Sequence, residues 1–168
     1  SQKGKSDIHV LSLNETDESG KFGSLVAGVM HVYSRGEVKF DSASGTGTAV
    51  FNQLSDERDR KVMREAVRFT YHLACSQSVS NIASSPLSDS VGTSAHWIGD
   101  AGDTEIDDWA LQQVGAYSHA AGSCAMGNSR HDMAVVNERA EVIGYQNLWL
   151  CDASILPILP RANTHLPV

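Results

Sequence analysis

One histidine stands in a run of small residues that has no ordinary helix or strand pattern. The stretch is SHAAGSCAMG at 118–127, and it carries His119. A second stretch without a regular pattern, RANTHLP at 161–167, carries Asn163. A histidine can take a proton near neutral pH, and an amide can donate a hydrogen bond to developing negative charge. Small residues let a flat or bulky molecule approach the backbone closely. The two stretches are therefore predicted to form walls of a cofactor or substrate pocket.

Other kinds of chemistry fit these residues less well. Ser123 lies in AGSCA, not in the GxSxG turn that presents the nucleophile of α/β-hydrolases. Cys124 would serve as a thiol nucleophile only if the irregular segment turned it toward His119, so a buried structural cysteine is favoured. A metal site could be drawn from His119, His131, His165 and Asp152. The spacing of these residues matches no compact zinc pattern.

Three strands are expected to precede these stretches and to form an antiparallel sheet. They are predicted at 7–13, 24–33 and 37–44, and the second is apolar on both faces and therefore central. GTGTAVFNQ at 45–53 is interpreted as irregular. A few helices should cover the sheet, so the predicted fold class is α+β.

Two helices are predicted from capping residues and apolar spacing. The first is capped by Ser55 and runs over 56–77, and the second is capped by Thr104 with Asp107 at the capping-box position. From 115 onward we expect short strands and loops. The side chains expected to face the core are Val62, Met63, Ala66, Val67, Thr70, Tyr71, Ala74, Ile106, Trp109, Leu111 and Val114.

The bulk properties exclude several classes of protein. The chain has 168 residues and a net charge of −7, which argues against nucleic acid or an anionic membrane as the main partner. Its apolar runs are too short to span a bilayer, and SQKGKSD at the start carries no hydrophobic signal region. Three cysteines without a CxxC pair indicate a reducing compartment. A cytoplasmic location is expected, with secretion as the alternative.

Several motifs, in the same order, resemble the glucose-methanol-choline (GMC) flavoprotein oxidoreductases. HAAGSCAMG at 119–127 is similar to the HPxGTCxMG of that family, and CDASILP at 151–157 is similar to its VDASxxP. SRGEV at 34–38 resembles SRGxV. Further similar stretches are FNQLSD at 51–56, AVVN at 134–137, VIGYQNLW at 142–149 and ANTHLP at 162–167. Ala120 and Ser123 are mild departures, since the family carries Pro and Thr there.

The resemblance implies an FAD-dependent oxidation of an alcohol to an aldehyde or ketone, with hydride passing to flavin N5. It assigns His119 as the base that takes the hydroxyl proton. The second catalytic position of the family falls on Asn163, which would orient the alcohol and donate a hydrogen bond to the alkoxide. The residues that match segments beside the cofactor are Asp152, Ala153, Asn163, Thr164 and His165.

The resemblance also implies a division of the chain and a partner. Residues 1–114 would form the substrate-binding domain and 115–168 the active-site segment, which completes a partner FAD-binding domain. No GxGxxG follows a strand here, so the FAD-binding part is expected on another polypeptide, as a separate subunit or the other half of a cleaved chain. A hydroxynitrile lyase of the same fold and a non-catalytic stabilising subunit are the alternatives.

Overall fold

The computed structural model describes residues 7–13, 23–83, 87–128 and 133–164. The chain divides into two compact units: Ser1–Val29 with Leu54–Val114, and Met30–Gln53 with Gly115–Val168. The division predicted from the sequence shares the boundary after Val114 but keeps 30–53 with the amino-terminal part. That functional division stays a prediction, because the two units are defined by contacts alone.

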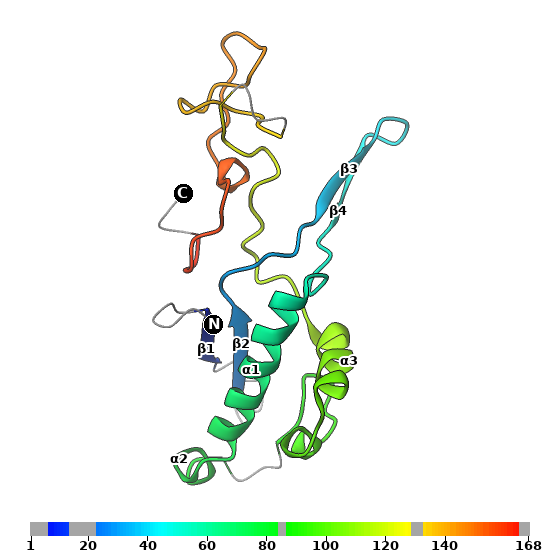
Figure 1. Ribbon diagram of the computed structural model, residues 1–168, viewed down its shortest axis with the longest axis vertical. Coiled ribbons are helices and arrows are strands. Elements are labelled where there is room, and N and C mark those ends of the chain that lie inside the picture. Colours follow the sequence, from blue (N-terminus) through cyan, green and yellow to red (C-terminus); the bar gives the residue numbers. More distant parts are fainter. Residues whose placement is uncertain (1–6, 14–22, 84–86, 129–132, 165–168) are drawn as a thin grey trace. The chain divides into compact units, whose positions relative to one another are not determined.

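The first unit contains an antiparallel hairpin of β1 (Ile8–Leu13) and β2 (Ser24–Val29) (Figure 1). Ile8 pairs with Val29, and Leu13 pairs with Ser24. The prediction that 24–33 is a central strand is wrong in two respects. β2 ends at Val29, and within the described residues it pairs with β1 alone. Its half-buried side chains are instead covered by α1 (Glu57–Ala74), which packs against it.

The helices of this unit begin one or two residues away from the predicted caps. Asp56, not Ser55, caps α1, and its carboxylate accepts the backbone N–H of Arg58 at 2.9 Å. α3 (Asp103–Gln113) starts after Gly102, whose N–H donates to the Glu105 carboxylate at 2.9 Å. Two short elements lie between them, α2 (Gln77–Ser80) and the 3₁₀ turn η1 (His96–Gly99).

A small apolar core holds these helices together. It is made of Val67, Ala95, Ile98 and Ile106, and Ile106 is fully buried. Trp97 and Trp109 pack against this core. Their two rings meet each other edge to face, with centroids 6.0 Å apart. Leu111, which was expected to face the core, is 50% exposed. The core therefore lies on one stripe of α3.

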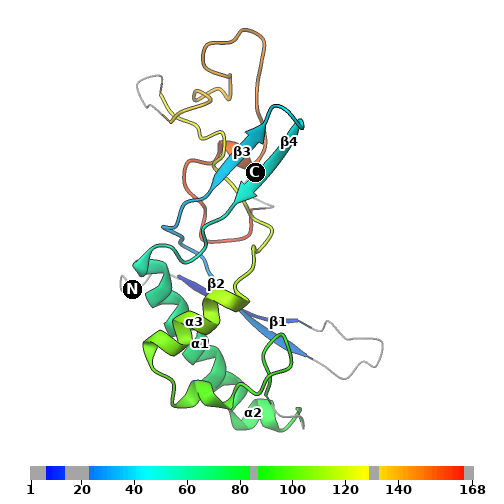
Figure 2. The same ribbon diagram turned by 90° about the vertical axis from the view of Figure 1, so that its right-hand side faces the viewer.

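Ion pairs reinforce the contact between α1 and α3, which lie side by side (Figure 2). Arg64 of α1 donates to the carboxylates of Asp107 at 2.6 Å and Glu57 at 2.8 Å. Arg68 donates to Asp103 at 2.8 Å. The bonds that Arg64 donates raise its pKa, with the bond to Glu57 as the largest cause. Asp107 thus joins two helices and does not complete a capping box.

The second unit contains a hairpin of β3 (Glu37–Asp41) and β4 (Thr46–Val50). The interpretation of 45–53 as irregular is therefore wrong for Thr46–Val50, and the third predicted strand stops at Asp41. The two hairpins are separate two-stranded sheets in the described residues, not one three-stranded sheet. Gly36 leads into β3, and an added Cβ there would lie 2.2 Å from the carbonyl oxygen of Val50.

The described part of 115–164 consists mainly of turns and isolated bridges. Val136 is fully buried at their centre and bridges to Met126 and Val142. The Asn137 side chain organises the next turn, since its oxygen accepts from the backbone N–H groups of Arg139 and Glu141. One 3₁₀ turn follows, η2 (Ala153–Ile155). The loops predicted from 115 onward are confirmed, but in the described residues isolated bridges stand in place of the predicted short strands.

Antiparallel strands and flanking helices confirm the α+β class. No helix in the described ranges is long and apolar enough to cross a membrane. The predicted site residues that the structure describes lie in the second unit, where irregular backbone brings distant segments together.

Candidate functional site

His119 lies in an irregular segment and is held from two sides. The residue before it, Ser118, has a φ of 59°, a left-handed conformation that turns the chain at this point. The ring of Tyr117 meets the His119 ring edge to face, with centroids 5.2 Å apart and planes at 82°. The His119 side chain is half-buried. A half-buried ring can be oriented by protein and still reach a small molecule.

Thr164 makes the polar contact to this histidine. Its hydroxyl oxygen lies 3.1 Å from Nδ1 of His119, and Thr164 is 8% exposed. The bond joins the two stretches from which the predicted pocket walls come, 118–127 and 161–167. Nε2 of His119 has no hydrogen-bond partner among the residues that the structure describes.

A third segment runs alongside the histidine segment. The backbone N–H groups of Gly122, Cys124 and Met126 donate in turn to the carbonyls of Ala153, Ser154 and Ile155, at 3.2, 2.9 and 2.9 Å. The donors of this ladder are alternate residues of 122–126, and the acceptors are the three consecutive residues of η2. The three segments 117–126, 152–156 and 161–164 are called the His119 cluster below.

Gly122 shows why small residues are needed in the His119 cluster. Its φ is +82°, and an added Cβ would lie 3.1 Å from the carbonyl oxygen of Leu156. A larger residue would both strain the backbone and push the two segments apart. The small residues were predicted to leave room for a ligand, and at Gly122 they also allow close backbone contact.

Residues 161–164 are tied down by a contact that the sequence did not indicate. Arg161 donates from Nε and Nη2 to Nδ1 of His31, at 3.1 and 2.6 Å. The ring of Tyr33 stacks on His31 with centroids 4.7 Å apart. Because an arginine can only donate, His31 accepts with a lone pair on Nδ1. No motif or periodicity pointed to His31, and only its place just before SRG could have drawn attention to it.

The remaining predicted site residues are placed as follows. Asn163 precedes Thr164 and its side chain is exposed. Asp152 is exposed and caps η2; hydrogen bonds from the hydroxyl and the backbone N–H of Ser154 lower the pKa of Asp152. Ala153 is half-buried within η2. His165 lies outside the described residues, so its predicted place beside the cofactor stays a prediction.

Among the residues that the structure describes, the alternative sites are not assembled. His119 makes no hydrogen bond to Ser123 or Cys124 within the described ranges. Cys124 is half-buried and uses its backbone in the ladder with Ser154, in keeping with a structural cysteine. Within the same ranges, no three His, Cys, Asp or Glu side chains gather as metal ligands. His131, one of the candidate ligands, lies outside them.

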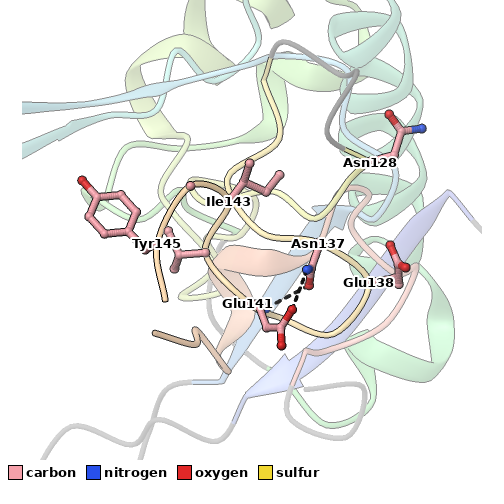
Figure 3. A pocket seen from close by; sticks show the side chains of 8 residues that line it. Asn128, Asn137, Glu138, Glu141, Ile143 and Tyr145 are labelled. Carbon is pink, nitrogen blue, oxygen red and sulfur yellow. Dashed lines mark hydrogen bonds between the residues drawn. The ribbon is translucent and has the colours of Figure 1, made fainter. Parts of the chain in front are cut away.

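A hollow in the second unit lies in a different set of turns (Figure 3). Its volume is about 400 Å³, and its polar lining includes Asn128, Asn137, Glu138 and Glu141. Asn137 donates to the Glu141 carboxylate at 2.8 Å, so these groups stabilise the turn. Neither His119 nor Thr164 lines the hollow, which is therefore distinct from the His119 cluster.

Comparisons with known proteins point to one family. Residues 32–168 match the family described as GMC oxidoreductase. An oxygen-dependent choline dehydrogenase of Vibrio vulnificus is 32% identical over 136 residues, which cover 80% of this chain and 23% of that protein. A glucose dehydrogenase [FAD, quinone] of Drosophila pseudoobscura pseudoobscura is 34% identical over 143 residues, covering 83% of this chain and 22% of the relative.

A solved structure shows the same fold. The crystal structure of pyridoxine 4-oxidase from Mesorbium loti matches 86% of this chain and 27% of its own chain, with a TM-score of 0.68 and 24% identity. The chain thus spans about a quarter of the length of the proteins that it matches. Sequence motifs, fold and the matched range of 137 of 168 residues (32 to 168) lead to one conclusion: the chain belongs to the GMC oxidoreductase family, of which it represents the carboxyl-terminal part.

Proposed function

We propose that this chain supplies the base and one pocket wall of an FAD-dependent oxidoreductase that converts an alcohol to an aldehyde or ketone. The observation that carries the proposal is the pair of His119 and Thr164. The hydroxyl of Thr164 occupies Nδ1, while Nε2 has no partner in the described part of the chain. A half-buried imidazole with one open nitrogen is suited to accept a proton from a bound hydroxyl group.

The roles of the chain's own residues follow from this geometry. Nε2 of His119 takes the hydroxyl proton when the alcohol oxygen lies within about 3 Å. Asn163 cannot accept a proton, but its amide N–H can donate to the alkoxide as charge develops. FAD, when bound, supplies the hydride acceptor for the carbon. Tyr117 and Thr164 keep the imidazole in place while the proton moves.

The residues of the His119 cluster fit one face of a flavin and do not fit a whole dinucleotide site. Ala120 and Ala121 add little bulk, so a planar ring system can approach this backbone. Asp152 and Asn163 are exposed and polar, as groups that contact a cofactor must be. The sequence has no GxGxxG to hold the ADP part of FAD.

We therefore propose that the FAD-binding part is contributed by another polypeptide, either a separate subunit or the other half of a cleaved chain. The second unit supports this because it exposes large apolar side chains that water solvates poorly. The exposed fractions are 72% for Phe40, 71% for Tyr145, 71% for Ile158, 62% for Val38 and 55% for Trp149. So many exposed apolar side chains in one small unit indicate a surface that a further folded part covers, which we propose to be the FAD-binding part.

Purification of the chain, alone and with the polypeptide that accompanies it, tests the proposal. The complex should show the visible absorbance of a flavin, and addition of the substrate alcohol should bleach it. The lone chain should be colourless, because it lacks the dinucleotide-binding part. A yellow lone chain would contradict the two-chain proposal, and a flavin that stays oxidised during turnover would favour the lyase of the same fold.

A comparison of Asn163 with His165 tests the assignment of the second catalytic position. We expect Asn163→Ala to lower kcat by about 10²-fold, as loss of one donor to a developing oxyanion does. His165→Ala should have the smaller effect, because His165 is proposed only to line the flavin. Steady-state kinetics of the assembled enzyme measures both. If His165→Ala is the more damaging variant, the second position belongs to His165.

A further inference from the structure

We propose that Thr164 is a positioning residue that fixes the tautomer of His119, by accepting a hydrogen bond from Nδ1–H. This inference rests on the proposed function, in which His119 is the base. It adds a role that neither the residue types nor their spacing indicated, since Thr164 was expected only to lie beside the cofactor. The geometry of the second unit carries it in three steps.

The first step is the contact itself. Oγ1 of Thr164 lies 3.1 Å from Nδ1 of His119, and Thr164 is 8% exposed. Within the described ranges, the side-chain partner of this hydroxyl is Nδ1 of His119. Water has little access to a hydroxyl buried to this extent, so the bond is not readily exchanged for a bond to solvent.

The second step is the direction of the hydrogen bond. A neutral imidazole carries its hydrogen on one nitrogen and a lone pair on the other. If Thr164 donated to Nδ1, the hydrogen would sit on Nε2, and His119 could not take a proton there. If Nδ1–H donates to Oγ1, the lone pair is on Nε2, the nitrogen without a partner in the described residues. Only the second arrangement leaves a base at the open side of the ring.

The third step is the anchoring of both partners. Arg161 lies three residues before Thr164 and donates to His31 Nδ1 at 3.1 and 2.6 Å. This bond fixes the short segment that carries the threonine. On the other side, the ring of Tyr117 meets His119 at 5.2 Å and restricts its rotation. With both partners held, the hydroxyl of Thr164 stays within hydrogen-bond distance of Nδ1 and, as the acceptor, stabilises the Nδ1–H tautomer.

Nitrogen-15 NMR of the neutral histidines in the 168-residue chain tests the proposal without an activity assay. The signals of His119 are assigned by their loss in His119→Gln. We expect Nδ1–H in the unchanged protein. Thr164→Val, which removes the hydroxyl but keeps the shape, should reduce the ratio of Nδ1–H to Nε2–H by about three- to tenfold, the effect of one lost hydrogen bond. Thr164→Ser should restore the ratio.

Kinetics of the assembled enzyme gives a second, independent result. Thr164→Val should lower kcat with a smaller change in KM, and Thr164→Ser should recover most of the loss. A histidine found as Nε2–H in the unchanged protein overturns the inference, and so does a ratio that Thr164→Val leaves unaltered. A protein with the expected tautomer but no alcohol oxidation would refute the proposed function while leaving this inference intact.

Discussion

Replacing His119 by alanine should lower kcat for alcohol oxidation by about 10²- to 10⁴-fold in the assembled enzyme, because the proton acceptor is lost. Substrate binding should suffer less, since most of the pocket would remain. The half-buried His119 packs edge to face on Tyr117 and bonds to Thr164, so its removal changes only the local cluster. Steady-state kinetics with the flavin content matched between variants measures the effect.

A second histidine provides the matched control for this prediction. His72 lies on the last turn of α1, is exposed, and belongs to the first unit. His72→Ala should leave kcat within about twofold of the unchanged enzyme, as expected for an exposed surface position. If His119→Ala behaves like His72→Ala, the chain is a stabilising subunit and not the source of the base.

The regular elements could be predicted where one physical pattern dominates. α1 repeats apolar residues every three or four positions, and Ala66 and Val67 of that stripe are buried as expected. β4 was missed because TGTAV has small, exposed residues and no alternation of apolar and polar side chains. β2 was predicted to be a central strand because it is apolar on both faces. An edge strand can also be apolar, because a helix that packs on the sheet covers its side chains, as α1 does here.

Helix starts were displaced because several residue types compete for a cap. Ser55 and Asp56 are both good capping residues, and the sequence alone does not rank them. The structure selects Asp56, whose carboxylate also pairs with the guanidinium of Arg58 at 2.7 Å. Hydrogen bonds from the Arg58 side chain are the main reason that the pKa of Asp56 falls below its usual value. The side-chain contact with Arg58 thus accompanies the choice of Asp56 over Ser55 as the cap.

The candidate site could be predicted in its residue types but not in its contacts. Histidine and asparagine among small residues indicated proton transfer near a flat ligand, and the motif order supplied the family. The bond between His119 and Thr164 spans 45 residues, and that between His31 and Arg161 spans 130. Both lie on irregular backbone, where no periodicity relates one position to another. Such pairings depend on the whole fold.

Replacing Ile106 by alanine should lower the free energy of unfolding of the first unit by about 2–5 kcal/mol, because it leaves a cavity in a close-packed core. Ile106 is fully buried and contacts the small cluster formed with Val67, Ala95 and Ile98. A core with so few members has little means of collapsing around the lost side chain. Urea unfolding monitored by tryptophan fluorescence measures the change, since Trp97 and Trp109 pack on this core.

Leu111 on the same helix is the control, because it is also a large aliphatic residue but is 50% exposed. Leu111→Ala should cost less than about 1 kcal/mol. Equal losses of unfolding free energy for the two variants would mean that α3 does not turn its buried residues, Ile106 and Ala110, toward the core. A large difference would show that the first unit has a specific packed interior.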